Sequence, residues 1–560
     1  MTTDLNLADI QGNVPRAYGR YSFPFARYYF FQIQTPAGGR AFVEQVRQKV
    51  TTATPWTKGT KPFCTTNIAF TFMGLWMLDL PVRTLQRMPD WFAEGMKARA
   101  FLLGDRDQTM TEEEAQGDHW CRHWDPIWQG NRAPLRAGKD DVHIWVSING
   151  QVASQTDLTH PHPAFLDRSD WLVNLADATE GVTLLRTNGR NGDQPWQDAS
   201  AVFQMIGGAM LPTPKEHFGF TDGIGNPVFE GQYPTGAAMD EQVIGQGKLV
   251  GGKWVPLATG EFLLGHPDES QELPPASVPP EFLHNGTFMA YRKLHENVGS
   301  FWEVVDRETE KYARIMEIPL EEAKETLLAK MCGRWSDGVP LSLVPSYAEW
   351  RAFQVKMGWG GDKAGTVEGY KANQAWIATP EAANFRFADD MAGLKCPVGA
   401  HMRRVNPRDY MDPLNEMGVD AETGAQPTNA KATSQLNNRR RILRRGLPYG
   451  PANLDDRSDE TEQGVIMMII AANLFRQFEF IQQQWIQYGL DFHEGNNTCP
   501  LLGNHEQHKL HPIASDPTSG KPPFIMSGLK TFVECRGGDY FFVPSMTALR
   551  MMAIGIVDPT

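Results

Sequence analysis

Alternating apolar residues are the sequence feature that most restricts how this chain can fold. Every second residue from Val142 to Ile148 is a branched apolar residue, which is the period of a strand. Residues 27–34 also predict a strand, and residues 40–51 predict the helix after it, because apolar side chains recur there at helical spacing. Further signals in this region are a strand at 67–75, a helix near 168–178 and a strand at 181–187. Two strand–helix–strand units in succession favour a ferredoxin-like α+β arrangement.

The second half of the chain repeats this pattern loosely. Its main signals are a strand at 287–292, a helix at 298–316, a second helix ending at Gly333, a buried strand at 465–472, a helix at 474–490, strands at 531–535 and 540–543, and a last helix that starts at Ser545. Residues 352–438 hold few regular signals. We therefore predict an α+β protein in two halves, divided into an N-terminal half at 1–215, a Gly- and Pro-rich seam at 216–280 and a C-terminal half at 281–560.

Composition and charge exclude several classes of protein. The chain has 560 residues with 41% apolar and 21% charged side chains, which is typical of a globular protein with a sizeable core. Its net charge of -13 argues against nucleic acid as the main partner. The longest apolar run, Val465 to Ala472, is too short to cross a bilayer, so we expect no membrane partner. Six scattered cysteines without a CxxC pair, and no basic, apolar leader at the start, predict a cytoplasmic protein.

A histidine crowded by arginines is the first candidate for chemistry. His401 follows Gly399 and precedes Arg403, Arg404 and Arg408. Imidazole is the commonest axial ligand of haem iron, and the two haem propionates attract guanidinium groups. A structural histidine in a basic turn explains this segment better when it is considered alone.

Two further segments point to one family when they are read with His401. Gly219-Phe-Thr-Asp222-Gly223 lies upstream of it, and Arg441-Ile-Leu-Arg444 lies downstream. In this order the three segments resemble the dye-decolourising peroxidases, a family of haem peroxidases, and most closely its long cytoplasmic bacterial members. Other matching stretches, spread along the whole chain, are Asp9–Asn13, Gly260–Gly265, Asn285–Phe288 and Arg536–Pro544.

This resemblance implies a fold, a cofactor and three principal residues. The fold would be two ferredoxin-like halves with antiparallel sheets and haem between the sheets, and the cofactor would be haem b. His401 would be the proximal iron ligand, and Asp222 and Arg444 would face hydrogen peroxide on the other side. The residue types suit these roles, since a carboxylate can move the peroxide proton and a guanidinium can stabilise charge on the departing oxygen.

Several secondary assignments follow from the same resemblance. Residues expected to contact the haem are His401, Arg404, Arg408, Phe220 and Gly223. An acid behind the proximal histidine is expected to be Asp491 or Glu494, although a solvated acid at a helix end explains either residue as well. Tyr449, in a Pro- and Gly-flanked turn that predicts exposure, is a candidate electron relay to the surface, and a ring packed beneath the turn is the alternative. Residues 410–438 are expected to form an inserted loop.

The predicted function is reduction of hydrogen peroxide coupled to oxidation of dyes, phenols or similar one-electron donors. A haem-binding carrier or sensor with little turnover is the main alternative, and such a protein would need His401 without Asp222 and Arg444. A non-haem metal site at His505, His508 and His511 is a third reading, and a polar surface loop explains those residues better. Small aromatic reductants are the expected partners, and self-association into a homo-oligomer is left open.

Overall fold

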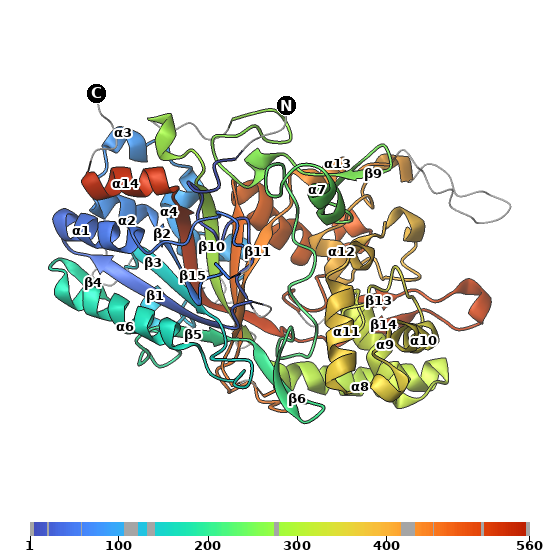
Figure 1. The fold of residues 1–560 in the computed structure, drawn as a ribbon. Helices are drawn as coiled ribbons and strands as arrows, with labels where there is room; N and C mark the ends of the chain where they lie inside the picture. The colour runs from blue at the N-terminus through green and yellow to red at the C-terminus, as the bar shows by residue number, and fades with distance from the viewer. Residues whose placement is uncertain are drawn as a thin grey trace.

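A computed structural model gives the fold of the chain (Figure 1). The residues that it describes are 5–19, 22–57, 59–105, 121–130, 141–273, 279–415, 432–451, 453–505 and 509–555. In this part of the chain no helix has both the length and the apolar character needed to cross a membrane.

The N-terminal half contains the predicted ferredoxin-like unit. Its strands are β1 (Phe25–Ile33), β2 (Cys64–Phe70), β3 (Ile144–Gly150) and β4 (Val182–Leu184), and β5 (Gln197–Ser200) adds to the edge of β1. The antiparallel order is β2-β3-β1-β4. Helix α1 (Pro36–Arg47) follows β1, and helix α6 (Pro163–Ala178) follows β3. The Thr35 hydroxyl caps α1, and Pro36 stands at its first position, where the missing N–H costs no hydrogen bond.

The C-terminal half has the same strand order in a second unit. Its strands are β10 (Thr287–Glu296), β11 (Leu443–Tyr449), β12 (Gly464–Ala471) and β15 (Val533–Val543), in the order β11-β12-β10-β15. In both units the first strand therefore lies between the third and the fourth, and the second lies beside the third. Phe542 of β15 pairs with Phe70 of β2, which joins the two units into one nine-stranded sheet. The predicted α+β fold with two antiparallel ferredoxin-like halves is confirmed.

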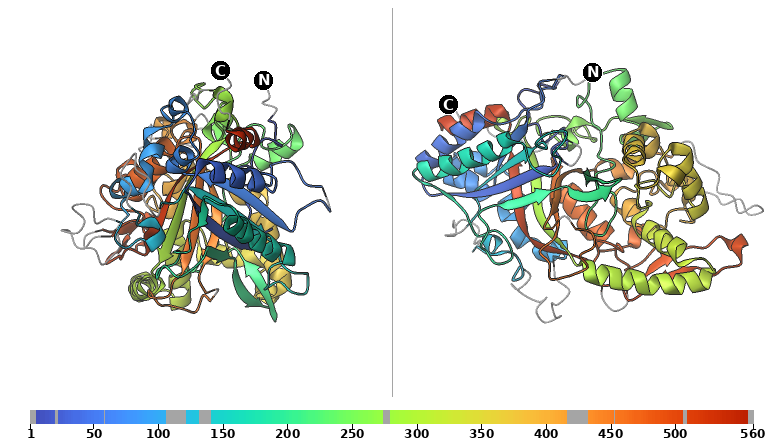
Figure 2. Two further views of the ribbon diagram at one scale, coloured as in Figure 1. Left: turned by 90° about the vertical axis from the view of Figure 1, so that its left-hand side faces the viewer. Right: turned by 60° about the horizontal axis from the view of Figure 1, so that its bottom comes forward.

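A lobe of helices covers the C-terminal unit on the side away from α1 and α6 (Figures 1 and 2). Its main helices are α8 (Val298–Met316), α9 (Leu320–Cys332), α10 (Tyr347–Met357), α11 (Val367–Ile377) and α12 (His401–Val405). Two π-helical stretches, Phe475–Glu479 and Ile481–Ile486, follow β12.

The remaining elements are short or peripheral. They are α2 (Phe72–Met77), α3 (Val82–Leu85), α4 (Asp90–Ala98), α5 (Ala100–Leu103), β6 (Val202–Ile206), β7 (Ala209–Thr213), α7 (Ala237–Gln242), β8 (Lys248–Val250), β9 (Lys253–Val255), α13 (Gln435–Asn438), β13 (His511–Ile513), β14 (Phe524–Met526) and α14 (Met546–Ile554).

Three sequence predictions about local structure need correction. The stretch 352–438 holds regular structure, because a capping box between Ser346 and Glu349 starts α10 and α11 follows it. The predicted helix at 474–490 is π-helical over much of its length. The two late strands form one strand, β15, in which the register against β10 shifts next to Gly537 and Gly538. Most of the expected insertion at 410–438 lies outside the described residues.

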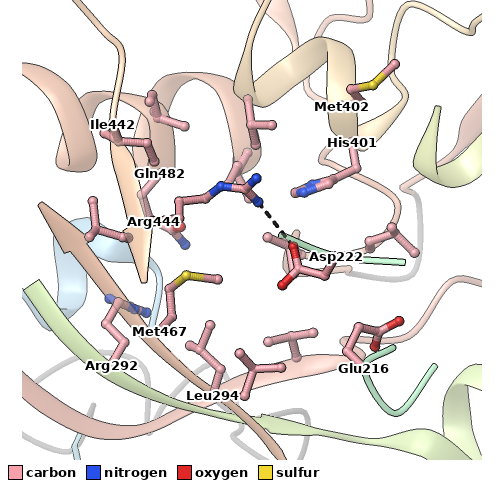
Figure 3. A pocket seen from close by; sticks show the side chains of 18 of the residues that line it. Glu216, Asp222, Arg292, Leu294, His401, Met402, Ile442, Arg444, Met467 and Gln482 are labelled. Carbon is pink, nitrogen blue, oxygen red and sulfur yellow. Dashed lines mark hydrogen bonds and ion pairs between the residues drawn. The ribbon is translucent and has the colours of Figure 1, made fainter. Parts of the chain in front are cut away.

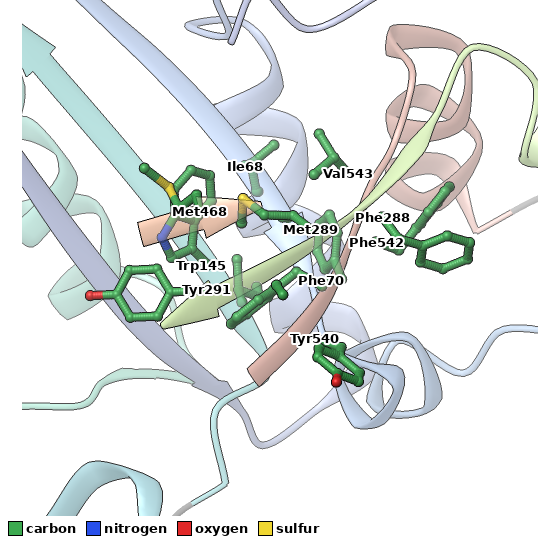
Figure 4. Close-up of a cluster of buried hydrophobic side chains, with 14 of the residues drawn as sticks. Ile68, Phe70, Trp145, Phe288, Met289, Tyr291, Met468, Tyr540, Phe542 and Val543 are labelled. Carbon is green, nitrogen blue, oxygen red and sulfur yellow. The ribbon is translucent and has the colours of Figure 1, made fainter. Parts of the chain in front are cut away.

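One hydrophobic core spans both halves of the sheet (Figure 4). Met289 and Tyr291 of β10 belong to it together with Ile68 and Trp145 of the N-terminal strands. The ring of Tyr28 packs edge-on against Tyr291, with ring centroids 5.7 Å apart. Fully buried aromatic and branched side chains thus fill the space between the two sets of strands, and a second core lies within the helical lobe.

Candidate active site

The pocket that holds the predicted site residues lies on the other face of β10. Side chains alternate along a strand, so Arg292, Leu294 and Glu296 line the pocket while Tyr291 enters the shared core. The helical lobe closes the opposite side with Met402 and other residues (Figure 3). The sequence prediction placed the haem between the two sheets. Buried side chains fill the space between the sheets, so this pocket lies elsewhere.

The walls of the pocket are largely apolar. Residues that contribute apolar surface include Phe220, Ile224, Leu294, Ile442, Val465, Met467, Ile469, Phe478, Ile481, Ile486, Leu501 and Val533. An apolar pocket with a few convergent polar groups is typical of a cofactor site.

A tight loop presents Asp222 to the pocket. The Glu216 carboxylate accepts hydrogen bonds from the backbone N–H of Phe218 at 2.8 Å and of Phe220 at 2.6 Å. The N–H of Asp222 donates to the Pro214 carbonyl at 2.8 Å, which closes the loop. The next residue, Gly223, has φ 81°, a left-handed conformation that favours glycine. The sequence Asp-Gly thus serves both a turn and the placement of a carboxylate.

Arg444 reaches the same point from strand β11. Its Nη1 lies 3.4 Å from Oδ1 of Asp222, and its Nη2 donates to the Ile224 carbonyl at 2.7 Å. The side chain of Asn226 accepts the backbone N–H of Arg444 at 2.8 Å, which fixes the strand against the loop. Both charged side chains of the pair remain partly exposed to the pocket.

His401 enters the pocket from the start of helix α12. Its imidazole points into the space that also holds Asp222 and Arg444 (Figure 3). Burial, together with the positive charge of Arg444, lowers the pKa of His401 to about 4. The ring is therefore neutral at pH 7, which is the form that binds a metal. The structure brings all three principal residues of the sequence prediction into one pocket.

Three more arginines line the pocket without a carboxylate partner. They are Arg334, Arg408 and Arg441, and in the described part of the chain none of them forms an ion pair with an acid. Arg408 donates to the carbonyls of Ala383 and Phe385 instead. Burial lowers the pKa of Arg441 to about 10, and the Arg444 charge adds to this effect. Buried, mutually repelling guanidinium groups next to an apolar space call for a ligand with negative charge.

The sequence reasoning found Arg408 and missed the other two. Arg334 lies far from the recognised segments, and only folding brings it to the pocket. Arg441 opens the matched segment Arg441-Ile-Leu-Arg444, but the resemblance drew attention to Arg444.

Arg404, which was predicted to contact the haem, lies outside the pocket. Its side chain is fully buried behind α12 and does not line the pocket. The guanidinium donates to Glu494 at 2.8 Å and to the backbone carbonyls of Gly399, Trp485, Tyr488 and Asn497. Arg404 therefore ties α12 to the segment that follows the π-helical stretches.

Neither acid predicted behind His401 contacts its ring. Asp491 accepts a hydrogen bond from the Trp485 indole at 3.0 Å, and Glu494 is the ion-pair partner of Arg404. The Nδ1 atom of His401 lies 3.4 Å from the Sγ atom of Cys499, a residue that the sequence reasoning did not single out. A lone cysteine without a motif carries no signal for such a position.

Tyr449 is buried, so the prediction of an exposed turn is wrong at this residue. Only 2% of its surface is exposed, and Lys293 Nζ lies 4.8 Å from the centroid of its ring. Its strand β11 pairs with β12 up to Gly464, which places the ring beneath the turn. The alternative of a packed ring describes its position, and a role as a surface relay loses its basis.

Of the two remaining residues predicted to contact haem, only one lines the pocket. Phe220 lines the pocket, next to Phe301 in the lobe core. Gly223 lies beside the pocket and lines two neighbouring hollows instead.

A pair of buried acids at the pocket was not foreseen. Glu216 and Glu296 lie against each other, and both line the pocket. Burial raises the pKa of Glu216 to about 7 and raises that of Glu296 well above its ordinary value, where the charge of Glu216 adds to burial. Glu296 lies on β10 and Glu216 in the Asp222 loop, so only the fold brings them together.

The late histidines have structural surroundings. His505 Nδ1 lies 3.1 Å from the Thr498 hydroxyl, and His511 Nε2 lies 3.2 Å from the Lys330 carbonyl. His508 lies outside the described residues. Among those residues no group of three or more His, Cys, Asp or Glu is arranged to hold a metal ion.

Comparisons with known proteins point to one family. No family model matches the sequence. The chain is 24% identical to peroxidase 2 of Mycetinis scorodonius over 98% of this chain and 87% of that protein. It is 25% identical to the multifunctional dye peroxidase DyP2 of an Amycolatopsis strain over 60% of this chain and 61% of that protein. A solved dye-decolorizing peroxidase in complex with 2,6-dimethoxyphenol superposes with a TM-score of 0.64 at 21% identity, covering 98% of this chain and 100% of the other.

The similarity to these proteins, both in sequence and in fold, thus extends over nearly the full length of the chain. Because a fungal relative aligns over this length, membership of the long bacterial branch stays a prediction. With Asp222, Arg444 and His401 gathered in one pocket, the chain is similar in sequence and in fold to the dye-decolourising peroxidases.

Proposed function

We propose that the protein is a haem peroxidase that reduces hydrogen peroxide and oxidises phenols, dyes or similar one-electron donors. The observation that carries this proposal is the gathering of Asp222, Arg444 and His401 in one apolar pocket. The solved relative named above was crystallised with a phenol, 2,6-dimethoxyphenol, which agrees with donors of this class. A carrier or sensor would have no use for the Asp222–Arg444 pair.

The residues of the pocket fit a haem group. His401 offers a neutral imidazole, which would hold the iron. Arg334, Arg408 and Arg441 offer positive charge without carboxylate partners among the described residues, which suits the two propionates. The apolar walls suit the porphyrin. We take the cofactor to be haem b, because a non-covalent group needs nothing beyond these contacts.

The proposed mechanism assigns one task to each polar residue. Haem, when bound, supplies the iron at which peroxide is reduced and at which donor electrons arrive one at a time. Asp222 takes a proton from the inner oxygen of the peroxide and returns it to the outer oxygen, which leaves as water. Arg444 stabilises the negative charge that develops on the outer oxygen, and its contact with Asp222 holds the two side chains side by side.

Further parts of the proposal concern location and assembly. We propose a cytoplasmic protein, because its six cysteines are sparse and contain no CxxC pair. We also propose the division into 1–215, 216–280 and 281–560, since the seam carries Asp222 to a pocket of the C-terminal unit. Hydrogen peroxide and small aromatic reductants are the proposed partners, neither nucleic acid nor membrane is among them, and a homo-oligomer is compatible with the fold.

The visible spectrum of the purified protein, with haem added, tests the function. We expect an intense Soret band, and oxidation of 2,6-dimethoxyphenol that requires added hydrogen peroxide. A Soret band without peroxide-dependent oxidation would favour the carrier or sensor. Absence of the Soret band after reconstitution would overturn the haem assignment.

A further inference from the structure

A second hollow lies on the other side of the Asp222 loop. Ile224 and Gly225 line both the candidate active site and this hollow. The rest of its wall comes from the N-terminal segment, with Arg16 and Tyr18, and from Trp56. The two spaces are thus separated by little more than the loop that carries Asp222.

A smaller hollow shares lining residues with both sites. It shares Tyr18 and Arg445 with the second hollow. It shares Asp222 and Arg444 with the active site. A molecule in the second hollow would therefore lie close to the proposed catalytic pair without entering the haem pocket.

The charge of the second hollow differs from that of the whole protein. The chain carries a net charge of -13, yet the described residues around this hollow include two arginines and no aspartate or glutamate. Arg16 donates to the backbone carbonyls of Ala53 at 2.6 Å and Thr54 at 3.0 Å. Arg445 donates to the carbonyl of Asn13 at 2.7 Å and has no ion pair within the described residues. Two cations held by neutral carbonyls keep their charge for an anion.

The same hollow offers flat aromatic surfaces. Tyr18 and Trp56 are stacked, with ring centroids 5.9 Å apart and an angle of 18° between the planes. The guanidinium carbon of Arg16 lies 4.8 Å from the centroid of the Trp56 ring. Tyr233 adds a third ring to the wall. A planar cation held against a planar ring is suited to an aromatic ligand with a negative substituent, because the ring stacks while the charge pairs.

We propose that the hollow around Arg16, Trp56 and Tyr233 binds an aromatic anion, meaning an aryl ring that bears a carboxylate or sulfonate group. Within the proposed peroxidase function, on which this reading of the ligand rests, the anion is a reducing substrate held next to the Asp222 loop. Arg16 and Arg445 pair with its charged group, and Trp56 stacks on its ring.

Binding of naphthalene-2-sulfonate to the haem-loaded protein tests this proposal without any turnover. Isothermal titration calorimetry in the absence of peroxide compares it with the neutral naphthalene-2-sulfonamide. We expect the wild-type protein to bind the sulfonate more tightly. Arg16→Gln should weaken sulfonate binding by about tenfold or more, the scale of one lost charged contact, and weaken sulfonamide binding less. Trp56→Leu should weaken the binding of both.

Arg27→Gln is the matched control. The guanidinium of Arg27 also packs on a tryptophan, 4.6 Å from the centroid of the Trp196 ring, but it lies outside the hollow and pairs with Asp198 at 2.9 Å. Its sulfonate affinity should equal that of the wild type.

Two results would overturn the proposal. One is wild-type sulfonate affinity in both Arg16→Gln and Trp56→Leu. The other is a loss of affinity in Arg444→Leu alone, which would place the probe in the haem pocket. Because no peroxide is present, the outcome is independent of the peroxidase proposal: a protein without peroxidase activity that still requires Arg16 for the sulfonate keeps the site and loses its role in turnover.

Discussion

Arg444 is the residue whose removal should affect the peroxide step most directly. Its guanidinium lies 3.4 Å from the Asp222 carboxylate and is held by the Ile224 carbonyl, so its position is fixed before peroxide arrives. Arg444→Leu should slow the reaction with peroxide on the order of a hundredfold, the scale of one lost charge-stabilising donor. Stopped-flow absorbance of the haem-loaded variant measures this rate.

A neighbouring arginine supplies the control for this variant. Arg440 donates to the Arg476 carbonyl and packs on Phe480, outside the pocket. Arg440→Leu should react with peroxide at the wild-type rate. Equal rates for wild type and Arg444→Leu would remove Arg444 from the chemistry.

His401 should determine whether the protein retains haem. Its ring is neutral at pH 7 and enters the pocket from α12, as an iron ligand requires. His401→Ala should lower the haem content of the purified protein several-fold, measured as the ratio of Soret to protein absorbance. His284→Ala, which changes an exposed histidine elsewhere, should keep the wild-type ratio. A wild-type spectrum and full occupancy in His401→Ala would contradict the assignment.

At the scale of elements, the contact between strand β10 and the Asp222 loop should make stability depend on pH. Glu296 and Glu216 have folded-state pKa values above their ordinary value of 4.5, and that of Glu216 is about 7. A raised folded-state pKa stabilises the fold where the acid is protonated. The free energy of unfolding should therefore fall as the pH rises from about 4.5 through about 7.

Glu296→Gln isolates this contribution, because the amide has the shape of the protonated acid and does not titrate. The variant should lose less stability than the wild type between pH 5 and pH 8, measured by urea unfolding at each pH. Glu310→Gln, at an exposed position on α8, should follow the wild-type curve. An identical pH dependence in wild type and Glu296→Gln would show that the pair does not titrate in this range.

Patterns of period two and 3.6 were sufficient to predict most strands of the sheet, but β11 (Leu443–Tyr449) was not predicted. The helix predicted from Val298 to Met316 has those bounds in the structure. Sequence patterns predict the structure less well where two local signals compete. Gly537 and Gly538 read as a break between strands, yet β15 continues through them, because its backbone adopts positive φ there and approaches Trp128 and Tyr291 closely.

The site residues divide in the same way. Asp222, Arg444 and His401 stand in short segments that can be recognised one at a time. The direction of a side chain depends on the surrounding fold. Arg404 points away from the pocket and donates to Glu494, whereas Arg441 faces the pocket. Strand alternation does separate Arg444, which faces Asp222, from Arg445, which faces the second hollow.

At the scale of the whole molecule, the two ferredoxin-like units are not independent bodies. The strand pair Phe70 and Phe542 joins their sheets, and one core contains side chains from both. Tyr291 of the C-terminal unit packs on Tyr28 of the N-terminal unit. The N-terminal unit contributes few residues to the active site, and it supports the face of β10 that lies behind the pocket.

Haem should stabilise the whole protein, and its propionates should account for part of the gain. A ligand that binds only the folded state raises its stability by mass action. The melting temperature should rise when haem is added to the haem-free protein, and rise less with haem dimethyl ester, which lacks the charges that we propose to pair with Arg334, Arg408 and Arg441. Differential scanning fluorimetry measures both. Equal shifts in melting temperature for the two compounds would show that these arginines do not bind the propionates.

The arginines of the pocket also bear on the life of the protein before it receives its cofactor. A newly made chain must bury Arg334, Arg408 and Arg441 beside one another with no acid from the described residues to neutralise them. Repulsion among them lowers the stability of the haem-free protein, which then unfolds and is degraded by proteases more readily. The amount of protein that persists would then follow the supply of haem, because molecules that have not bound haem are lost.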